Sequence, residues 1–292
     1  MQRTHRSLAA ALLALGCACA LEQPRPLPGL AEHAPFRVHA EDQRSAEFAL
    51  ENAAFGLGAA RQLPGLRERG TIEIRVTRVG AAAPGGATRW RGELGQRGEA
   101  WIELALGEDP GEQRFLIGHE LTHALLDATW QELPQIVEEG LADHVGERAS
   151  PECGAARRLA HAIRLCSWTG PGLAIVRAGE PPETLFARLD LESLPEPVAM
   201  LELDGRSYHD VKPAENRELL YALGYLIVER IGLVKLRELC AAAQAAGEKH
   251  VAPAKLLEAA HLDAHDKRSW TPAIEALVGA RELEALKRVR SR

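Results

Sequence analysis

Two histidines and a glutamate lie close together in the segment Gly118-His119-Glu120-Leu121-Thr122-His123. In a helix, residues four apart are separated by about 40° around the axis, so the imidazoles of His119 and His123 can reach one metal ion. Glu120 lies one position further round. That position suits a carboxylate that removes a proton from metal-bound water better than one that ligates the metal. The pattern predicts a metal site with its own general base.

A catalytic zinc site has three protein ligands and keeps one position for water, so a third ligand must come from elsewhere. We expect this ligand to be Glu139, which lies 16 residues after His123 and leaves room for a turn and an antiparallel return. Asp143, one helical turn later, is expected to hold the other ring nitrogen of a ligating histidine. Glu138 and His144 are the alternative ligands. The alternative to any metal site is a solvated acidic helix face.

The elements that must position these residues can be read around the motif. Asp109-Pro110-Gly111-Glu112 predicts a helix start, with Asp109 as cap and Pro110 at the first position. Pro134 predicts the start of a second helix. Upstream, alternating apolar residues predict strands at 71–76 and 101–106, a shorter strand at 36–39 and a helix at 46–60, with a loop at 80–86.

The chain after residue 150 is predicted to be helical. Apolar residues at helical spacing predict six helices, at 155–168, 184–189, 217–230, 233–246, 254–261 and 272–288. The predicted fold class is therefore α+β: a small sheet with the motif-bearing helix, followed by a predominantly helical C-terminal part. We place the metal-binding part at 36–150 and the helical part at 151–292.

The first twenty residues predict export from the cytoplasm. Arg3 and Arg6 precede an apolar run that ends in small residues, which is the layout of a signal peptide covering 1–20. Cleavage before Leu21 is favoured, and a lipid anchor at Cys17 is the alternative. Residues 21–35 are rich in proline and predict a linker. No later segment is long enough to span a bilayer.

Charge and cysteine content narrow the possible partners. The formal net charge is −6 and there is no dense Lys/Arg block, so neither nucleic acid nor an anionic membrane is expected as a partner. Cys153 and Cys166 could pair in an oxidising compartment, and the sequence leaves this open. The remaining histidines, His161 among them, show no ligand spacing and are interpreted as surface or structural residues.

The motif His119-Glu120-Leu121-Thr122-His123, followed by Glu138-Glu139-Gly140-Leu141-Ala142, resembles the HExxH plus Glu-Gly-x-Ala signature of the gluzincin metallopeptidases. The resemblance covers roughly residues 101–145 and is closest to compact peptidase MA-like domains. It implies a zincin-like fold, a Zn²⁺ cofactor, and a peptide or protein substrate. It also implies that Glu139 is the third ligand and that Asp143 supports a ligand histidine. The spacing after His123 is shorter than in thermolysin or the large aminopeptidases, so their pocket residues cannot be transferred.

Residues 221–232 resemble the helix that follows the metal site in peptidase MA-like proteins. The resemblance suggests Tyr221 as a hydrogen-bond donor to the oxyanion of a tetrahedral intermediate. Tyr225 and Tyr208 are the alternatives, and a purely core-facing stripe is another. In zincins a strand before the active helix pairs with substrate, so the strand at 101–106 is expected to line the cleft.

Together these features predict an exported zinc metallopeptidase in which Glu120 is the general base. An endopeptidase is favoured, because no Gly-x-Met-Glu-Asn-type stretch is present to anchor a free amino terminus. The alternative is a catalytically silent zinc-binding protein of the cell envelope that acts as a binding or assembly module.

Overall fold

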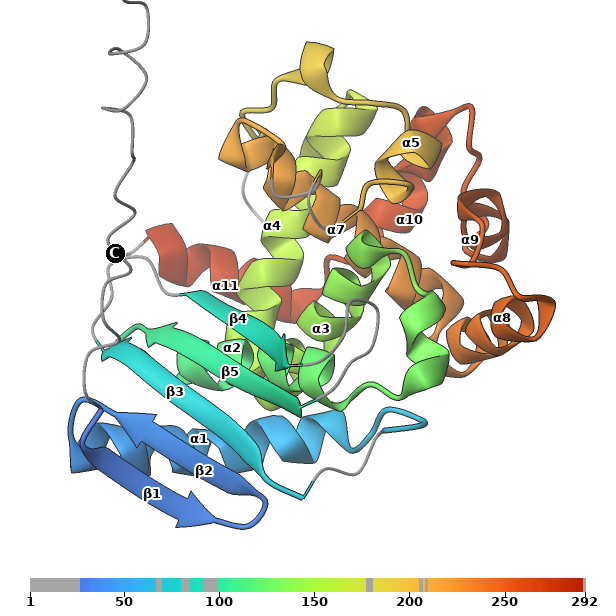
Figure 1. The fold of residues 1–292 in the computed structure, drawn as a ribbon. Coiled ribbons are helices and arrows are strands. Elements are labelled where there is room, and N and C mark those ends of the chain that lie inside the picture. The colour runs from blue at the N-terminus through green and yellow to red at the C-terminus, as the bar shows by residue number, and fades with distance from the viewer. Residues whose placement is uncertain are drawn as a thin grey trace, which may run out of the picture.

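The computed structural model describes residues 27–66, 70–79, 85–91, 99–176, 181–204, 207 and 210–290. Within this part, a five-stranded mixed sheet is followed along the chain by a predominantly helical region (Figure 1). The α+β class predicted from the sequence is confirmed. The predicted signal peptide, with Cys17 and the cleavage site before Leu21, lies outside the described residues, as does Tyr208.

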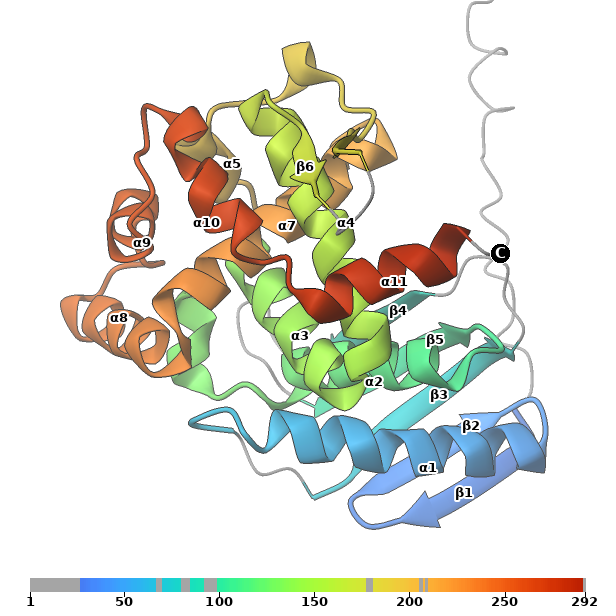
Figure 2. The same cartoon turned by 180° about the vertical axis from the view of Figure 1, so that it is seen from behind.

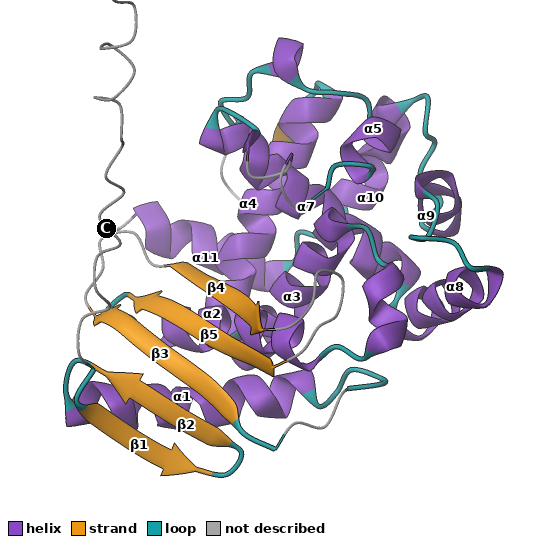
Figure 3. Cartoon of the chain, in the orientation of Figure 1, coloured by secondary structure: helices purple, strands orange, loops and turns teal. Residues whose placement is uncertain are grey.

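The main sheet has the strand order β1-β2-β3-β5-β4 (Figure 3). Strands β2, β3 and β5 run parallel, whereas β1 and β4 pair antiparallel at the two edges. The strands predicted at 36–39, 71–76 and 101–106 are confirmed. The bounds are β1 Gly29–His33, β2 Phe36–Ala40, β3 Ile72–Val79, β4 Gly85–Arg91 and β5 Glu99–Leu106.

Both edge strands lie where the sequence predicts no strand. Strand β1 falls inside the predicted linker at 21–35, so that prediction is wrong for residues 29–33. Strand β4 begins inside the predicted loop at 80–86 and continues to Arg91. An edge strand need not carry an alternating apolar pattern, because its pairing with the neighbouring strand is enough to define it.

One face of the sheet packs against helices α1 (Gln43–Ala60) and α2 (Pro110–Leu125). These helices lie behind the sheet in Figure 1 and in front of it in Figure 2. In β3 the side chains of Ile72, Ile74 and Val76 are buried, while the residues between them are partly exposed, as period-two alternation requires. Helix α2, which carries the histidine motif, is thereby fixed on the sheet.

Helix α3 (Gln135–Ala149) is the central helix of the molecule. It packs against α2, α4 (Pro151–Thr169) and α7 (Ala214–Ile231). At the crossing with α7 the two backbones touch: a Cβ atom added to Gly140 would lie 2.1 Å from the carbonyl carbon of Gly224. Only glycine permits this approach, so the helical region packs directly on the helix that carries Glu139.

The connection from α2 to α3 passes through a short 3-10 helix, η1 (Ala128–Glu132). Arg237 of α8 (Leu233–Ala246) binds this connection from outside. Its Nη2 lies 2.6 Å from Asp127 Oδ2, and its Nη1 donates to the carbonyl oxygen of Pro64 at 3.0 Å. The guanidinium thus joins the end of α2, the segment after α1 and the C-terminal helices.

Most of the predicted C-terminal helices are confirmed. The helices predicted at 155–168, 217–230, 233–246 and 254–261 correspond to α4, α7, α8 and α9 (Pro253–Ala259), and α5 (Pro197–Leu201) was not predicted. The helix predicted at 184–189 is wrong. That segment contains β7 (Glu183–Leu185), which pairs with β6 (Leu173–Ile175). The prediction failed because periodicity over six residues cannot distinguish a helix from a strand.

The single helix predicted at 272–288 is two helices, α10 (Thr271–Glu275) and α11 (Ala280–Arg290). The break falls at Gly279, whose N–H donates to Glu282 Oε2 at 2.7 Å. Two further 3-10 helices, η2 (Leu191–Ser193) and η3 (Lys267–Trp270), complete the described elements.

The three cysteines within the described residues are free. Cys153 and Cys166 lie on the same helix, α4, so their separation of 13 residues is about 20 Å along the axis. A disulfide requires Cα atoms within about 7 Å, so this pair cannot form one. Among the helices of the described chain, none has the length and hydropathy that crossing a bilayer demands.

Candidate metal centre

Helix α2 presents both histidines of the motif from one face. Its N-terminus is capped as predicted, because Asp109 Oδ1 accepts hydrogen bonds from the backbone N–H groups of Gly111 and Glu112. The side chains of His119 and His123 are buried, each with 8% exposure, and their Nε2 atoms are 3.3 Å apart. The two rings therefore converge on one point, as the spacing predicts.

Helix α3 brings Glu139 to the same point. Glu139 Oε2 lies 3.3 Å from His119 Nε2 and 3.6 Å from His123 Nε2. Its other oxygen, Oε1, accepts a hydrogen bond from Gln135 Nε2 at 2.7 Å, which fixes the orientation of the carboxylate. His119, His123 and Glu139 form a buried cluster that can hold a metal ion.

The outward-facing ring nitrogens are held by two further carboxylates. Asp143 Oδ1 lies 2.8 Å from His119 Nδ1, which is the contact predicted for Asp143. Glu138 Oε1 lies 2.8 Å from His123 Nδ1. A carboxylate on Nδ1 keeps that nitrogen protonated and leaves Nε2 free to ligate a metal.

These contacts decide between the alternative ligands. Glu138 contacts the far nitrogen of His123, so the structure brings Glu139 and not Glu138 into the cluster that can hold a metal ion. His144 lies elsewhere, with its Nδ1 2.6 Å from Glu229 Oε1 on α7. Helix α3 turns Glu138 about 100° away from Glu139, which explains why the two neighbours have different partners.

His161 on α4 extends the chain of contacts. Its Nε2 lies 3.0 Å from Asp143 Oδ2, and the side chain is 1% exposed. One carboxylate thus bridges two histidines, His119 and His161. Of the two sequence interpretations of His161, surface or structural, the structure supports the structural one, and the carboxylate partner was not foreseen because it comes from another helix and leaves no local spacing.

The buried charges shift one another's pKa values. Burial alone would lower the pKa of His119, but hydrogen bonds with Asp143 and Glu139 outweigh it and raise this pKa to about 9. For His123 burial again acts downward, and the charge of Glu139 with the hydrogen bond to Glu138 raises its pKa well above the ordinary range. Burial would raise the pKa values of Glu139 and Asp143, but the neighbouring histidines lower both.

Glu120 lies beside the cluster, beneath strand β4. Its Oε2 accepts a hydrogen bond from Thr88 Oγ1 at 2.8 Å, and the side chain is 5% exposed. The strand crosses closely here, because a Cβ atom added to Gly86 would lie 2.6 Å from Glu120 Cγ. Glu120 is therefore held by the edge strand and is not one of the three clustered ligand groups.

A cavity of about 270 Å³ opens onto these groups. One wall is β4, through residues 86–89, and the lining also includes Gln135, Glu139 and Tyr221. The expectation that the strand at 101–106 lines the cleft is wrong: that strand is β5, none of its residues 101–106 lines this cavity, and the unpredicted β4 is the edge strand beside it. The signal for β4 was weak because its sequence, GGATRWR, has no apolar alternation.

The tyrosines on α7 have separate environments. Tyr221 lines the cavity, and its ring centroid is 6.3 Å from that of His119. Tyr225 is buried one turn further along, where its hydroxyl donates to Glu147 and Arg158 lies over its ring. Burial, followed by the charge of Glu147, raises the pKa of Tyr225. Tyr221, and not Tyr225, is therefore the tyrosine of α7 that lines the cavity.

Comparisons with protein-family models, with curated proteins and with solved structures found no match to this chain. The chemistry of the centre is therefore argued from its own residues. The possible donors are two imidazoles and one carboxylate. They line a cavity whose walls also include the carboxylates of Glu120 and Glu138.

Proposed function

We propose that this protein is a zinc-dependent metallopeptidase of the gluzincin kind. The observation that carries the proposal is the convergence of His119, His123 and Glu139 on one point, with Glu120 beside them on the same cavity. Two imidazoles, one carboxylate and an open side are the donor set of a catalytic zinc site. The fold assignment as zincin-like is part of this proposal.

The spacing of the donor atoms supports zinc. Bonds of about 2.0–2.2 Å in a tetrahedral arrangement put the ligand atoms about 3.3–3.5 Å apart. The three distances between donor atoms here are 3.3, 3.3 and 3.6 Å. The carboxylates on both Nδ1 atoms favour the tautomer that such a site needs.

A bound zinc ion supplies Lewis acidity, which lowers the pKa of a bound water and polarises the scissile carbonyl. Glu120 accepts the proton of the attacking water and later donates it to the leaving amine. Thr88 orients Glu120 for this transfer through the hydrogen bond to Oε2. Tyr221, which lines the same cavity, donates a hydrogen bond to the developing oxyanion.

Strand β4 gives the substrate a surface to bind. It is the last strand of the sheet order and borders the cavity, so its outer backbone groups can pair with an extended peptide by strand addition. This supports an endopeptidase, because a peptide bound along the edge of a strand can extend beyond the scissile bond on both sides. With the sequence features of residues 1–20, we propose that the enzyme acts outside the cytoplasm.

The test is the zinc content of the chain that begins at Leu21, after dialysis against metal-free buffer. We expect about one zinc per chain, and a sharp loss in Glu139→Ala. Glu51→Ala is the matched control, because Glu51 is an exposed glutamate on α1. Equal zinc contents in both variants, or no zinc in the wild type, would contradict the proposed site.

Turnover is tested separately with peptide libraries against Glu120→Gln. This variant keeps the three ligands and removes the base, so zinc should stay while cleavage stops. Zinc-loaded wild-type protein that cleaves no faster than Glu120→Gln would favour the silent zinc-binding module instead.

A further inference from the structure

A second cavity adjoins the candidate metal centre. It has a volume of about 300 Å³ and shares Gln135 and Glu138 with the first cavity. Gln135 is the residue that holds Glu139 Oε1, so the boundary between the two cavities lies beside the third ligand. Gln135 and Glu138 thus line both cavities, and the second cavity adjoins the site of the first.

Three segments far apart in the sequence form the walls. They are the start of α3, the residues that follow α5, and the connection between α8 and α9. The connection is fixed in place, because the Val251 N–H donates to the carbonyl oxygen of Glu132 at 2.8 Å and Val251 is buried. The connection between α8 and α9 thus forms one wall of this cavity, beside the candidate metal centre.

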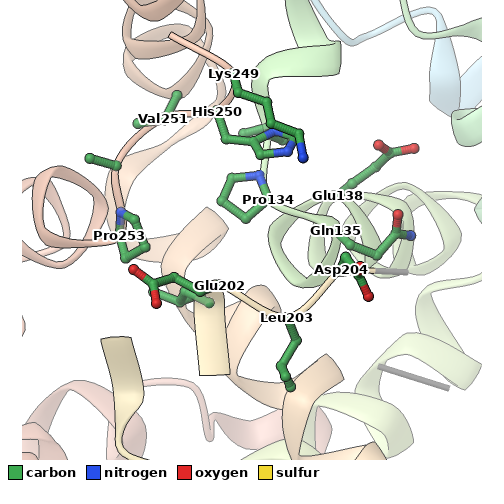
Figure 4. A pocket seen from close by; sticks show the side chains of 13 residues that line it. Pro134, Gln135, Glu138, Glu202, Leu203, Asp204, Lys249, His250, Val251 and Pro253 are labelled. Carbon is green, nitrogen blue, oxygen red and sulfur yellow. The ribbon is translucent and has the colours of Figure 1, made fainter. Parts of the chain in front are cut away.

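The lining combines an apolar surface with charged groups. Pro134, Leu201, Leu203 and Val251 are among the apolar residues. Figure 4 shows Lys249 and His250 on one side of Pro134, with Glu202 and Leu203 on the opposite side. A surface of this kind suits a side chain with an aliphatic stem and a charged end, because the stem contacts the apolar residues while the end stays at the rim.

The charges at the rim favour a positive end. Glu202 and Asp204 are exposed at the cavity, whereas Glu138 at its boundary is buried and contacts His123. Lys249 is the one lysine or arginine among the described lining residues. Burial, followed by the charge of Lys249, lowers the pKa of His250, so this imidazole is neutral near pH 7. Carboxylates therefore outnumber cations.

We propose that this second cavity is a substrate subsite that selects a lysine or arginine side chain of the peptide near the scissile bond. The inference rests on the proposed peptidase function and names its substrate class. A volume of about 300 Å³ is at the lower end of small-ligand pockets, which fits one side chain. Glu202 and Asp204 are the specificity-determining residues.

The test compares the zinc-loaded full chain with its Glu202→Gln/Asp204→Asn variant. Asparagine at 204 keeps an oxygen that can accept the Ser207 N–H, which lies 2.8 Å from Asp204 Oδ1. Glu47→Gln/Glu51→Gln is the matched control, because it removes the same charge from the exposed side of α1. The substrates are peptides that carry Lys, Arg, Leu or Glu at one position at a time around the scissile bond.

We expect one position at which Lys and Arg exceed Glu by about tenfold in kcat/KM for the wild type and the control. In the double variant this ratio should fall several-fold, because kcat/KM for the Lys and Arg peptides falls toward the value for the Leu peptide. An active wild type with no such position, or a ratio that the double variant leaves unaltered, overturns the inference and leaves the peptidase function standing.

Binding measurements keep the two proposals separate if no peptide is cleaved. The same peptides are titrated into zinc-loaded Glu120→Gln protein, with and without the Glu202→Gln/Asp204→Asn pair. Tighter binding of the Lys and Arg peptides that depends on the two acids supports the subsite even without turnover. Equal affinities for Lys and Glu peptides refute it.

Discussion

The carboxylate of Glu138 lies 2.8 Å from His123 Nδ1, so the residue directly before the third proposed ligand holds the far side of a ligand ring. Two adjacent glutamates on α3 thus have different roles, because one helical step separates their side chains by about 100°. Asp143 does the same for His119 from the next turn. Helix α3 alone supplies one proposed ligand and both carboxylates that contact the two histidines.

Replacing Glu138 should weaken the metal site without abolishing it. In Glu138→Ala the His123 ring loses its Nδ1 partner, and we expect zinc affinity to fall about 10- to 100-fold. Competition with a chromogenic chelator measures this. Glu132→Ala, which removes a carboxylate from η1, is the control. An unchanged affinity in Glu138→Ala would mean that the contact with His123 has no effect on the metal.

His161 should act on the metal through Asp143. In His161→Leu, Asp143 Oδ2 loses a buried partner at 3.0 Å, and zinc affinity should fall. In His161→Gln the side-chain amide can still donate to Asp143, so much of the affinity should return. Both variants are compared by chelator competition and by thermal unfolding. If the glutamine variant binds zinc no better than the leucine variant, His161 contributes only packing.

Contact between α3 and α7 makes Gly140 intolerant of any side chain. In Gly140→Ala the new Cβ would lie 2.1 Å from a Gly224 backbone atom, so the helices must separate. We expect a loss of at least about 1–3 kcal/mol in the free energy of unfolding, measured in urea. Gly58→Ala on α1 is the control, because a Cβ atom added there would have no atom of the described residues within 4 Å. This change should be neutral or stabilise by about 0.5–1 kcal/mol.

The stability of metal-free protein should fall as pH rises above neutrality. The pKa of His119 is raised from 6.5 to about 9, so its protonated form stabilises the fold fully below pH 6.5 and loses this effect as pH rises through 9. The depressed pKa values of Glu139 and Asp143 add no change in this range. Urea midpoints of chelator-treated protein between pH 6.5 and 9 test the expectation.

Saturating zinc should reverse that trend, since a metal binds the neutral imidazole and competes with the proton. Zinc affinity is therefore expected to increase over the same pH range. A metal-free midpoint that rises with pH would show that the charged form of the His119 cluster does not stabilise the fold.

Tyr221→Phe should separate catalysis from metal binding. The phenylalanine ring keeps the shape of the cavity wall but removes the hydroxyl donor. We expect zinc content to stay at the wild-type level while kcat falls about 100-fold. Tyr221→Phe protein with wild-type kcat would leave Tyr221 as a wall residue only.

The sequence predicts the main groups of the centre: the two histidines, Glu139 after a turn, and Asp143 beside a histidine ring. Helical spacing is enough to pair His119 with His123 and Glu139 with Asp143, and capping residues are enough to locate the start of α2. The contact of Glu138 with His123 depends on how α2 and α3 cross, which spacing along the chain does not determine. The hydrogen bond from Gln135 to Glu139 was predictable, because Gln135 lies four residues earlier on the same helix face.

Contacts between distant segments left no local pattern. Thr88 reaches Glu120 from an edge strand whose sequence has no apolar alternation, and His161 reaches Asp143 from α4. Strands β1 and β4 exist because neighbouring strands pair with them, which is a property of the folded sheet. The same reason explains why the wall formed by Val251 and its neighbours was not expected.

Arg237 gives the connection between α2 and α3 an attachment that comes from outside the motif. Together with Gly224 at the α3 crossing and His161 behind Asp143, it means that residues 119–143 depend on three later helices for their geometry. We therefore do not expect this segment to form the same site outside this fold. A graft of these 25 residues onto another helical scaffold would include every proposed donor atom but not the residues that fix their positions. The spacing of the donor atoms therefore depends on the whole domain and not on the sequence motif alone.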